Sequence, residues 1–265
     1  MKESFTSVYE WALNVLKEPN PEKKVRLSID TNTVDISLKN LSRRIPTPTR
    51  PARPKFPLLL QPRDMPRRST GQKGRVAFVH ALAHIELNAI DLAWDMILRF
   101  GPELENTTFI IDWIKVAKDE AQHFQLLSRR LIDFGQSYSD LPAHDGLWEA
   151  AMKTSHDVLD RLAVIPMMLE ARGIDTTPAA VNRIKSSNDM KTALVLEKIY
   201  HDEIEHLRIG VFWFEHICNA RELDPIATWR YLVGHHLNSK PKMPLNVEGR
   251  CQAHMNPEYW ENWCK

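Results

Sequence analysis

The sequence predicts an all-α fold, and three observations support this. The chain has only nine glycines in 265 residues. Its apolar residues recur with the 3.6-residue period of a helix over several long stretches. Glycine and proline, the residues that most often end helices, fall mainly between these stretches. A chain of this length can bury a sizeable core, either as one large domain or as two small ones.

The N-terminal part predicts one short helix and a long extended arm. The helix covers about 4–17 and ends at the sequence KEPNPEKK, and residues 25–40 predict a short strand or a loop. Residues 43–68 carry seven of the 17 prolines, so they cannot form a helix.

The arm is also strongly basic. It has Asp64 as its single acidic residue, and its basic residues are Arg43, Arg44, Arg50, Arg53, Lys55, Arg63, Arg67 and Arg68. Two interpretations stay open. The arm wraps the helices of its own chain, which we favour, or it follows the phosphate backbone of an RNA.

Four long helices and one final helix are predicted after the arm. Their expected bounds are about 73–100, ending at Gly101–Pro102; about 108–134, capped by Thr107 and ending at Gly135; a third ending at Arg172 before Gly173; about 189–220; and a last helix from Asp224–Pro225 to about 236. A short helix is expected to begin at Thr-Thr-Pro 176–178, and the tail to be irregular. Pro166 is expected to kink the third helix, and the alternative is that the helix begins there.

Each of the four long helices carries one glutamate in the middle of its apolar stripe. These are Glu86, Glu120, Glu170 and Glu203, and two of them have a histidine three residues later, His123 and His206. Residues three apart on a helix lie one turn apart on the same side, so a Glu and a His with this spacing can bind one ion together.

The spacing of the glutamates repeats. Glu86 and Glu120 are 34 residues apart, and Glu170 and Glu203 are 33 apart. Each half therefore supplies one lone Glu and one Glu-x-x-His, which is the ligand set of a two-metal site in a four-helix bundle. No lysine or arginine shares the stripes, and two divalent ions would neutralise four carboxylates. The alternative is a set of buried polar residues satisfied by local hydrogen bonds.

Oxygen and imidazole ligands without thiolates favour iron, with manganese as the second choice. The three cysteines form no Cys-x-x-Cys pair, which argues against a cysteine-ligated zinc site. His80 and His84, four residues apart, are a candidate metal pair, but a structural role is favoured. His201, His216, His235, His236 and His254 are expected on the surface or in packing roles.

Six stretches carry a family resemblance: PARPKFPLLL, GRVAFVHALAHIELNAIDLAWD, DWIKVAKDEAQHF, MMLEARGIDTTP, KIYHDEIEHLRIG and PLNVEGR. With them the sequence resembles the ferritin-like di-iron carboxylate superfamily. It is most similar to the bacterial ferritin-like family catalogued as domain of unknown function 455.

The resemblance implies a ferritin-like four-helix bundle with one longer crossover, an extended proline-rich N-terminal arm and an extra C-terminal helix. It implies three segments: residues 1–70 with the first helix and the arm packed on the bundle, 71–222 as the bundle, and 223–265 as the C-terminal helix and tail. It also implies that the metal ligands are Glu86, Glu120, His123, Glu170, Glu203 and His206.

Three further residues are candidates for supporting the metals. Asp119 and Asp202 match the position of an aspartate that orients a ligand histidine in related di-iron oxygenases. Tyr200 lies one turn before Glu203, where it is a candidate redox or proton partner of the metals. A core tyrosine with a satisfied hydroxyl is the favoured alternative for it.

The expected function is an oxygen-activating oxidoreductase of the hydroxylase type that uses a small organic substrate and an electron donor. Two alternatives are kept: a non-enzymatic or ferroxidase-like iron-handling protein, and a tRNA-modifying di-iron hydroxylase. The stretches LEARG and DEAQHF resemble the matching motifs of the tRNA-hydroxylating di-iron enzyme. A homodimer is left open. Net charge is +1, no apolar run of about 18 residues is evident and the N-terminus is not typical of a signal peptide, so a cytoplasmic protein without a membrane partner is expected.

Overall fold

The computed structural model describes residues 6–36, 44–69 and 71–263. Within these ranges the predicted all-α class is confirmed, because helices dominate and the two strands are each two residues long and pair in parallel. Predictions for residues 4–5, 37–40 and Arg43 lie outside the described ranges. The elements are β1 (Thr6–Ser7), α1 (Val8–Lys17), α2 (Pro21–Ile29), β2 (Val34–Asp35), η2 (Pro62–Asp64), α3 (Gln72–Leu104), α4 (Thr107–Asp133), α5 (Gly146–Lys153), α6 (Val158–Val164), η3 (Ile165–Glu170), α7 (Ala171–Ser186), α8 (Met190–Ala220), α9 (Pro225–Leu237), α10 (Val247–Gln252) and η4 (Pro257–Tyr259).

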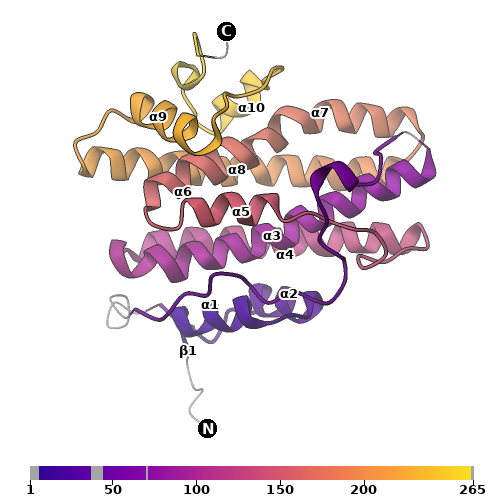
Figure 1. Cartoon of the computed structure of the whole chain (residues 1–265), viewed down its shortest axis with the longest axis horizontal. Coiled ribbons are helices and arrows are strands. Elements are labelled where there is room, and N and C mark those ends of the chain that lie inside the picture. The colour runs from indigo at the N-terminus through magenta and orange to yellow at the C-terminus, as the bar shows by residue number, and fades with distance from the viewer. Residues whose placement is uncertain (1–5, 37–43, 70, 264–265) are drawn as a thin grey trace. The chain divides into compact units, whose positions relative to one another are not determined.

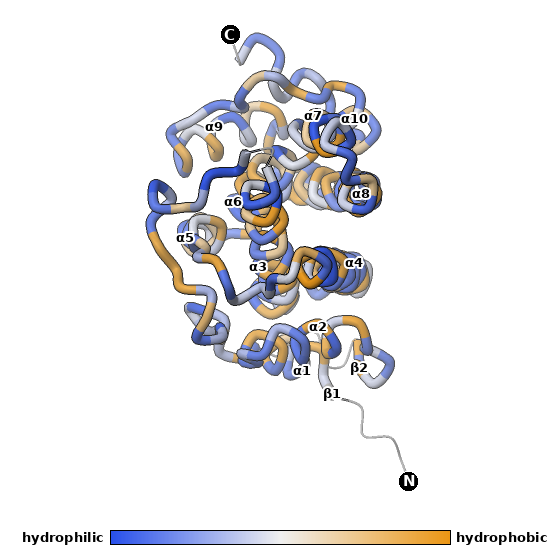
Figure 2. The backbone as a smooth tube through the Cα atoms, turned by 90° about the vertical axis from the view of Figure 1, so that its right-hand side faces the viewer, coloured by the Kyte–Doolittle hydropathy of each residue, from blue (hydrophilic) through white to orange (hydrophobic). Residues whose placement is uncertain are grey.

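The chain divides into two compact units, Met1–Trp148 and Glu149–Lys265, with the boundary inside α5. The division after residues 70 and 222 that the sequence suggests stays a prediction. In unit 1 the two longest helices, α3 and α4, pack together, with α1 against α3 and α2 against α4 (Figure 1). Hydrophilic and hydrophobic residues both occur along α4 in Figure 2, as expected of an amphipathic helix.

Helix α3 continues through the Gly101–Pro102 pair, where the sequence predicts its end. It reaches Leu104 and ends at Glu105, whose φ is 46°. Proline usually forces the residue before it out of the helical region by contact with that residue's Cβ, and Gly101 has no Cβ. The next helix, α4, is capped by Asn106 and not by Thr107 as predicted. The Asn106 side-chain oxygen accepts hydrogen bonds from the backbone N–H groups of Thr108 and Phe109.

The segment 25–40 is also more helical than predicted. Residues Pro21–Ile29 form α2, and among residues 25–36, which the structure describes, only Val34–Asp35 form a strand. The sequence KEPNPEKK does end α1, but its Asn20–Pro21 pair also begins the next helix, since the Asn20 side chain accepts from the backbone N–H of Lys23 and proline is favourable at the first helical position.

The basic arm lies against the helices of unit 1. The Ala52 N–H donates to the Leu16 carbonyl over 2.7 Å, and the Trp148 indole donates to the Thr49 carbonyl over 3.0 Å. Arg53 forms an ion pair with Asp91 at 2.6 Å. Asp91 is fully buried, and its other oxygen binds the buried ammonium of Lys24 at 2.5 Å. This network joins the arm, α2 and α3.

In unit 2 the elements α6, η3 and α7 form one continuous helical run, and η3 is a π-helical segment. Pro166, where the sequence predicts a kink, is the second residue of this π-helical segment. The predicted end at Gly173 is wrong, because the run continues through Gly173 and Pro178 to Ser186. Pro178 cannot donate to the Ile174 carbonyl one turn earlier, and the side chain of Asn246 donates to it over 3.3 Å instead.

The later elements agree better with the sequence. Helix α8 (Met190–Ala220) and helix α9 (Pro225–Leu237), capped by Asp224, have the predicted bounds to within a residue or two. The tail is less irregular than predicted, since it forms α10 and η4. Arg250 on α10 holds both oxygens of Asp175 on α7 at 2.8 Å, and both side chains are buried.

One of the described helices, α3, is long and apolar enough to cross a membrane, which corrects the expectation that no such run exists. Of its most apolar 18-residue window, 78% is buried inside the fold. Composition of this kind is shared by core helices of globular proteins, and α3 occupies such a core position.

Replacing Asp91 with alanine should lower the free energy of unfolding by about 3–5 kcal/mol. The substitution leaves the Lys24 ammonium buried without its carboxylate, which is the costly way to break a buried ion pair. Denaturant unfolding of the wild type and the variant measures this. Lys185→Ala, which breaks the more exposed pair with Glu197, is the control and should cost under about 1 kcal/mol. Equal effects of the two variants would contradict the argument.

Gly210→Ala should be destabilising, whereas Gly234→Ala should be neutral or stabilising. A Cβ on Gly210 would lie 2.8 Å from the Cβ of Pro166, so α8 and η3 would have to separate, at a cost of about 1–3 kcal/mol. A Cβ on Gly234 meets nothing within 4 Å, and alanine is favoured in a helix by about 0.5–1 kcal/mol. Thermal unfolding of both variants checks the pair, and a stabilising effect at Gly210 would refute the close approach.

Candidate metal centre

Unit 1 brings together three of the six predicted ligands. Glu86 lies on α3, and Glu120 and His123 lie one turn apart on α4. One donor atom from each side chain lies within 4.8 Å of those of the other two. The Nδ1 atom of His123 is 3.4 Å from a Glu86 oxygen and 3.3 Å from a Glu120 oxygen. All three residues are buried, with at most 4% of their surface exposed.

The electrostatics of this cluster favour an added positive charge. Burial raises the pKa of Glu86 well above its ordinary value, and the carboxylate of Glu120 raises it further, while His123 acts in the opposite direction. Two neighbouring carboxyl groups in a buried site cannot both be ionised unless a cation accompanies them, and without one a carboxyl keeps its proton. A divalent cation would allow both to be ionised and would take neutral His123 as a third ligand.

Unit 2 holds the other three predicted ligands. Glu203 and His206 lie one turn apart on α8, with 3.6 Å between a Glu203 oxygen and the Nδ1 of His206. His206 is buried, and the side chain of Glu203 is 14% exposed. Glu170 is half-buried and is the last residue of η3. Segments of π-helix occur often at functional sites, and this one ends on a predicted ligand.

The supporting residues fall in different surroundings. Asp119 is half-buried on α4 beside Glu120. Asp202 binds the ammonium of Lys198 at 2.6 Å, one turn earlier on α8. The hydroxyl of Tyr200 accepts a hydrogen bond from the side chain of Asn246 over 2.8 Å, as the structural alternative for this residue requires. The roles of Asp119 and Asp202 in orienting ligands stay predictions.

His80 and His84 are held by Tyr138, in the loop that follows α4. The Nε2 of His80 contacts the Tyr138 carbonyl at 2.5 Å, the Nδ1 of His84 contacts the Tyr138 hydroxyl at 2.7 Å, and both rings stack on the Tyr138 ring. Burial lowers the pKa of His84 to about 3, and nearby Arg53 contributes to the shift. Both histidines line a pocket of unit 1 together with Asn88 and His144. These contacts agree with the favoured structural role.

A second donor group was not predicted from the sequence. It consists of His156, Asp160 and His236, whose donor atoms lie within 4.8 Å of one another, all in unit 2. His236 is therefore not only a packing residue. His156 and Asp160 are four residues apart, which is a weak local signal, but His236 lies 76 residues beyond Asp160. Only the folded chain brings these residues together.

Replacing Glu86 with glutamine should make the stability of the metal-free protein less dependent on pH. Because the pKa of Glu86 is raised on folding, the folded chain binds a proton that the unfolded chain releases above about pH 4.5. Wild-type stability should therefore fall as pH rises from that value, and E86Q should lack this component and have the higher denaturation midpoint at pH 8. Denaturant unfolding between pH 5 and 8 tests this, with E22Q at an exposed position as the control. A steeper loss in E86Q would overturn the expected sign.

Comparison with known proteins agrees with the predicted family. The family model described as "Protein of unknown function (DUF455)" matches residues 17–261. An uncharacterized protein of Haemophilus influenzae is 37% identical over 260 residues, which cover 94% of this chain and 90% of that protein. No solved structure matches. With a family model that spans nearly the whole chain, this protein belongs to the DUF455 family.

Proposed function

We propose that the protein binds two divalent metal ions, iron in the first place and manganese as the alternative, in a ferritin-like four-helix bundle. Glu86, Glu120 and His123 supply half of the ligands. The other half is supplied by Glu170, Glu203 and His206. The proposed activity is that of an oxygen-activating oxidoreductase of the hydroxylase type.

The observation that carries the proposal is the buried donor group of unit 1. Two carboxylates and an imidazole, each almost inaccessible to water, converge within 4.8 Å. Burial and the neighbouring carboxylate raise the pKa of Glu86, so the metal-free cluster has too much negative charge for its surroundings. The donor set, with oxygen and nitrogen and no sulfur, fits iron or manganese.

The repeat of the pattern in the second unit supports two ions instead of one. Glu203 and His206 repeat the Glu-x-x-His spacing of Glu120 and His123. His206 is buried on α8 as His123 is on α4. A lone glutamate precedes each pair by nearly the same number of residues, 34 in one unit and 33 in the other. The same set of ligands, two single glutamates and two Glu-x-x-His pairs, occurs in di-iron helical bundles.

The chain's own residues would bind the ions and keep water away from them. Ala117 and Phe124, about one turn before and after Glu120, are buried apolar residues that offer no competing polar group. His123 would act as a neutral ligand beside the two carboxylates. When bound, the ions would supply the redox chemistry with dioxygen that no protein side chain provides. The proposed partners are a small organic substrate and an electron donor, and the proposed location is the cytoplasm.

The two alternatives differ in what they require. An iron-handling role needs the same ligands but no organic substrate. An RNA-directed role needs arginines of the arm for phosphate contacts, and two of these make internal ion pairs: Arg53 with Asp91, and Arg50 with Asp145 at 2.7 Å. These contacts favour the arm as part of the fold and count against the RNA alternative.

Anaerobically prepared wild-type protein, loaded with iron(II), should contain about two ions per chain by elemental analysis. E120Q and E203Q should each lose most of this iron, because each removes one charged ligand. E197Q, on the same helix as Glu203 but paired with Lys185, should retain it. Folded E120Q and E203Q proteins that keep the wild-type iron content would refute the centre.

Oxygen consumption separates the oxidoreductase from the iron-handling alternative. With a chemical reductant and a panel of small organic compounds, an oxidoreductase should consume oxygen over many turnovers and release an oxidised product. An iron-handling protein should stop when the added iron(II) is oxidised. In either case the rate of oxygen consumption by E120Q should be at least about tenfold lower than that of the wild type.

A further inference from the structure

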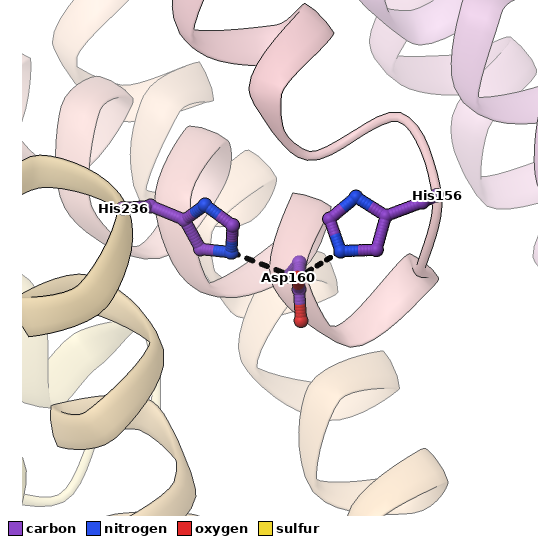
Figure 3. A group of neighbouring side chains, drawn as sticks. All are labelled: His156, Asp160 and His236. Carbon is purple, nitrogen blue, oxygen red and sulfur yellow. Dashed lines mark hydrogen bonds and ion pairs between the residues drawn. The ribbon is translucent and has the colours of Figure 1, made fainter.

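His156, Asp160 and His236 form a compact donor group that shares no residue with the proposed binuclear centre. His156 comes from the turn between α5 and α6, Asp160 from the first turn of α6 and His236 from the end of α9 (Figure 3). The Nε2 atoms of both imidazoles lie 2.8 Å from the same oxygen of Asp160. Both rings thus direct the same kind of nitrogen at one carboxylate.

Several contacts hold the three segments in place. The Trp229 indole on α9 donates to the Ala163 carbonyl on α6 over 3.2 Å, which fixes α9 against α6. Asp157 caps α6 by accepting from the Leu159 N–H over 2.7 Å. The same carboxylate binds Arg221, at the end of α8, through both of its oxygens at 2.7 and 3.0 Å. These contacts fix the backbone around Asp160, and none of them uses the Asp160 side chain.

Asp160 interacts with two histidines, His156 and His236, and with no lysine or arginine among the residues that the structure describes. The nearest aspartate along the chain, Asp157, already holds Arg221. The side chains of Asp160 and His236 are 12% and 9% exposed, whereas that of His156 is 63% exposed. His156 is therefore the solvent-exposed member of the group, whereas Asp160 and His236 are largely buried.

We propose that His156, Asp160 and His236 bind one divalent zinc ion. Two imidazoles and a carboxylate are zinc ligands, and three protein ligands leave a fourth position open for water or an added ligand. Imidazole nitrogen suits zinc better than it suits magnesium or calcium, which prefer oxygen. The absence of a thiolate in the group separates it from the closed structural zinc sites.

The two nitrogen–oxygen distances require only a small adjustment. In a tetrahedral site with bonds of about 2.0–2.2 Å, neighbouring ligand atoms lie roughly 3.4 Å apart. The two nitrogen–oxygen distances of 2.8 Å would each open by about half an ångström. His156 can make this shift because its side chain is mostly exposed and sits in a turn. The bound ion would join the α5–α6 turn to the end of α9.

Zinc titration of metal-free protein against a chromogenic chelator tests the site. The wild type should bind one zinc more than H156A and one more than H236A, and D160N should lose the same equivalent. H216A, which removes an exposed histidine of α8, should bind as the wild type does. Cobalt(II) should give the visible absorption bands of a four-coordinate ion in the wild type and H216A, and these should be missing in H156A.

Two comparisons make the result unambiguous. E120Q, which removes a ligand of the binuclear centre, should keep the zinc equivalent that H156A loses, so failure of one site does not imply failure of the other. H156A changes an exposed turn residue, and its circular dichroism should match that of the wild type. Equal zinc binding by the wild type, H156A and H236A would overturn the proposal and leave the three side chains as a hydrogen-bonded cluster.

Discussion

Helix α3 buries three carboxylates within ten positions, Glu86, Asp91 and Asp95, and each must be compensated locally because water cannot reach it. Asp91 lies between Lys24 and Arg53, and Asp95 holds Arg99 through two hydrogen bonds one turn away. Glu86 instead faces a second carboxylate, Glu120, and a histidine. The same helix thus neutralises two of its charges with basic side chains and brings a third next to another acid.

The carboxylates of α3 fix the positions of the other elements of unit 1 in two ways. The Lys24–Asp91–Arg53 network attaches α2 and the arm to α3, so two segments that precede α3 in the chain depend on a charge buried in that helix. The cluster at Glu86 needs α3 and α4 in fixed register, since it takes one donor side chain from α3 and two from α4. Long uninterrupted helices joined by the two residues Glu105 and Asn106 supply that register.

The sequence predicts the helical class, the bounds of α8 and α9 and the meeting of Glu86 with Glu120 and His123, because these depend on local periodicity and on charges that would otherwise be unsatisfied. It fails where tertiary contacts override local signals. Gly101–Pro102 does not end α3, and Pro178 stays inside α7 because Asn246, 68 residues later, serves the carbonyl that the proline leaves. The group at Asp160 was missed for the same reason, since no local pattern ties His236 to it.

The π-helical segment η3 changes how the residues after it are oriented. In a π turn each N–H reaches back five residues instead of four, so one extra residue is accommodated without a loop. One residue corresponds to about 100° of rotation around an α-helix. A helical wheel drawn through Leu159, Ala163, Pro166 and Glu170 therefore loses its phase inside this segment. A relative with one residue fewer inside Ile165–Glu170 would form a plain α-helix there and still present the residue at the position of Glu170 on the same side. Glutamates of such relatives should therefore be matched to Glu170 with a one-residue gap inside this segment.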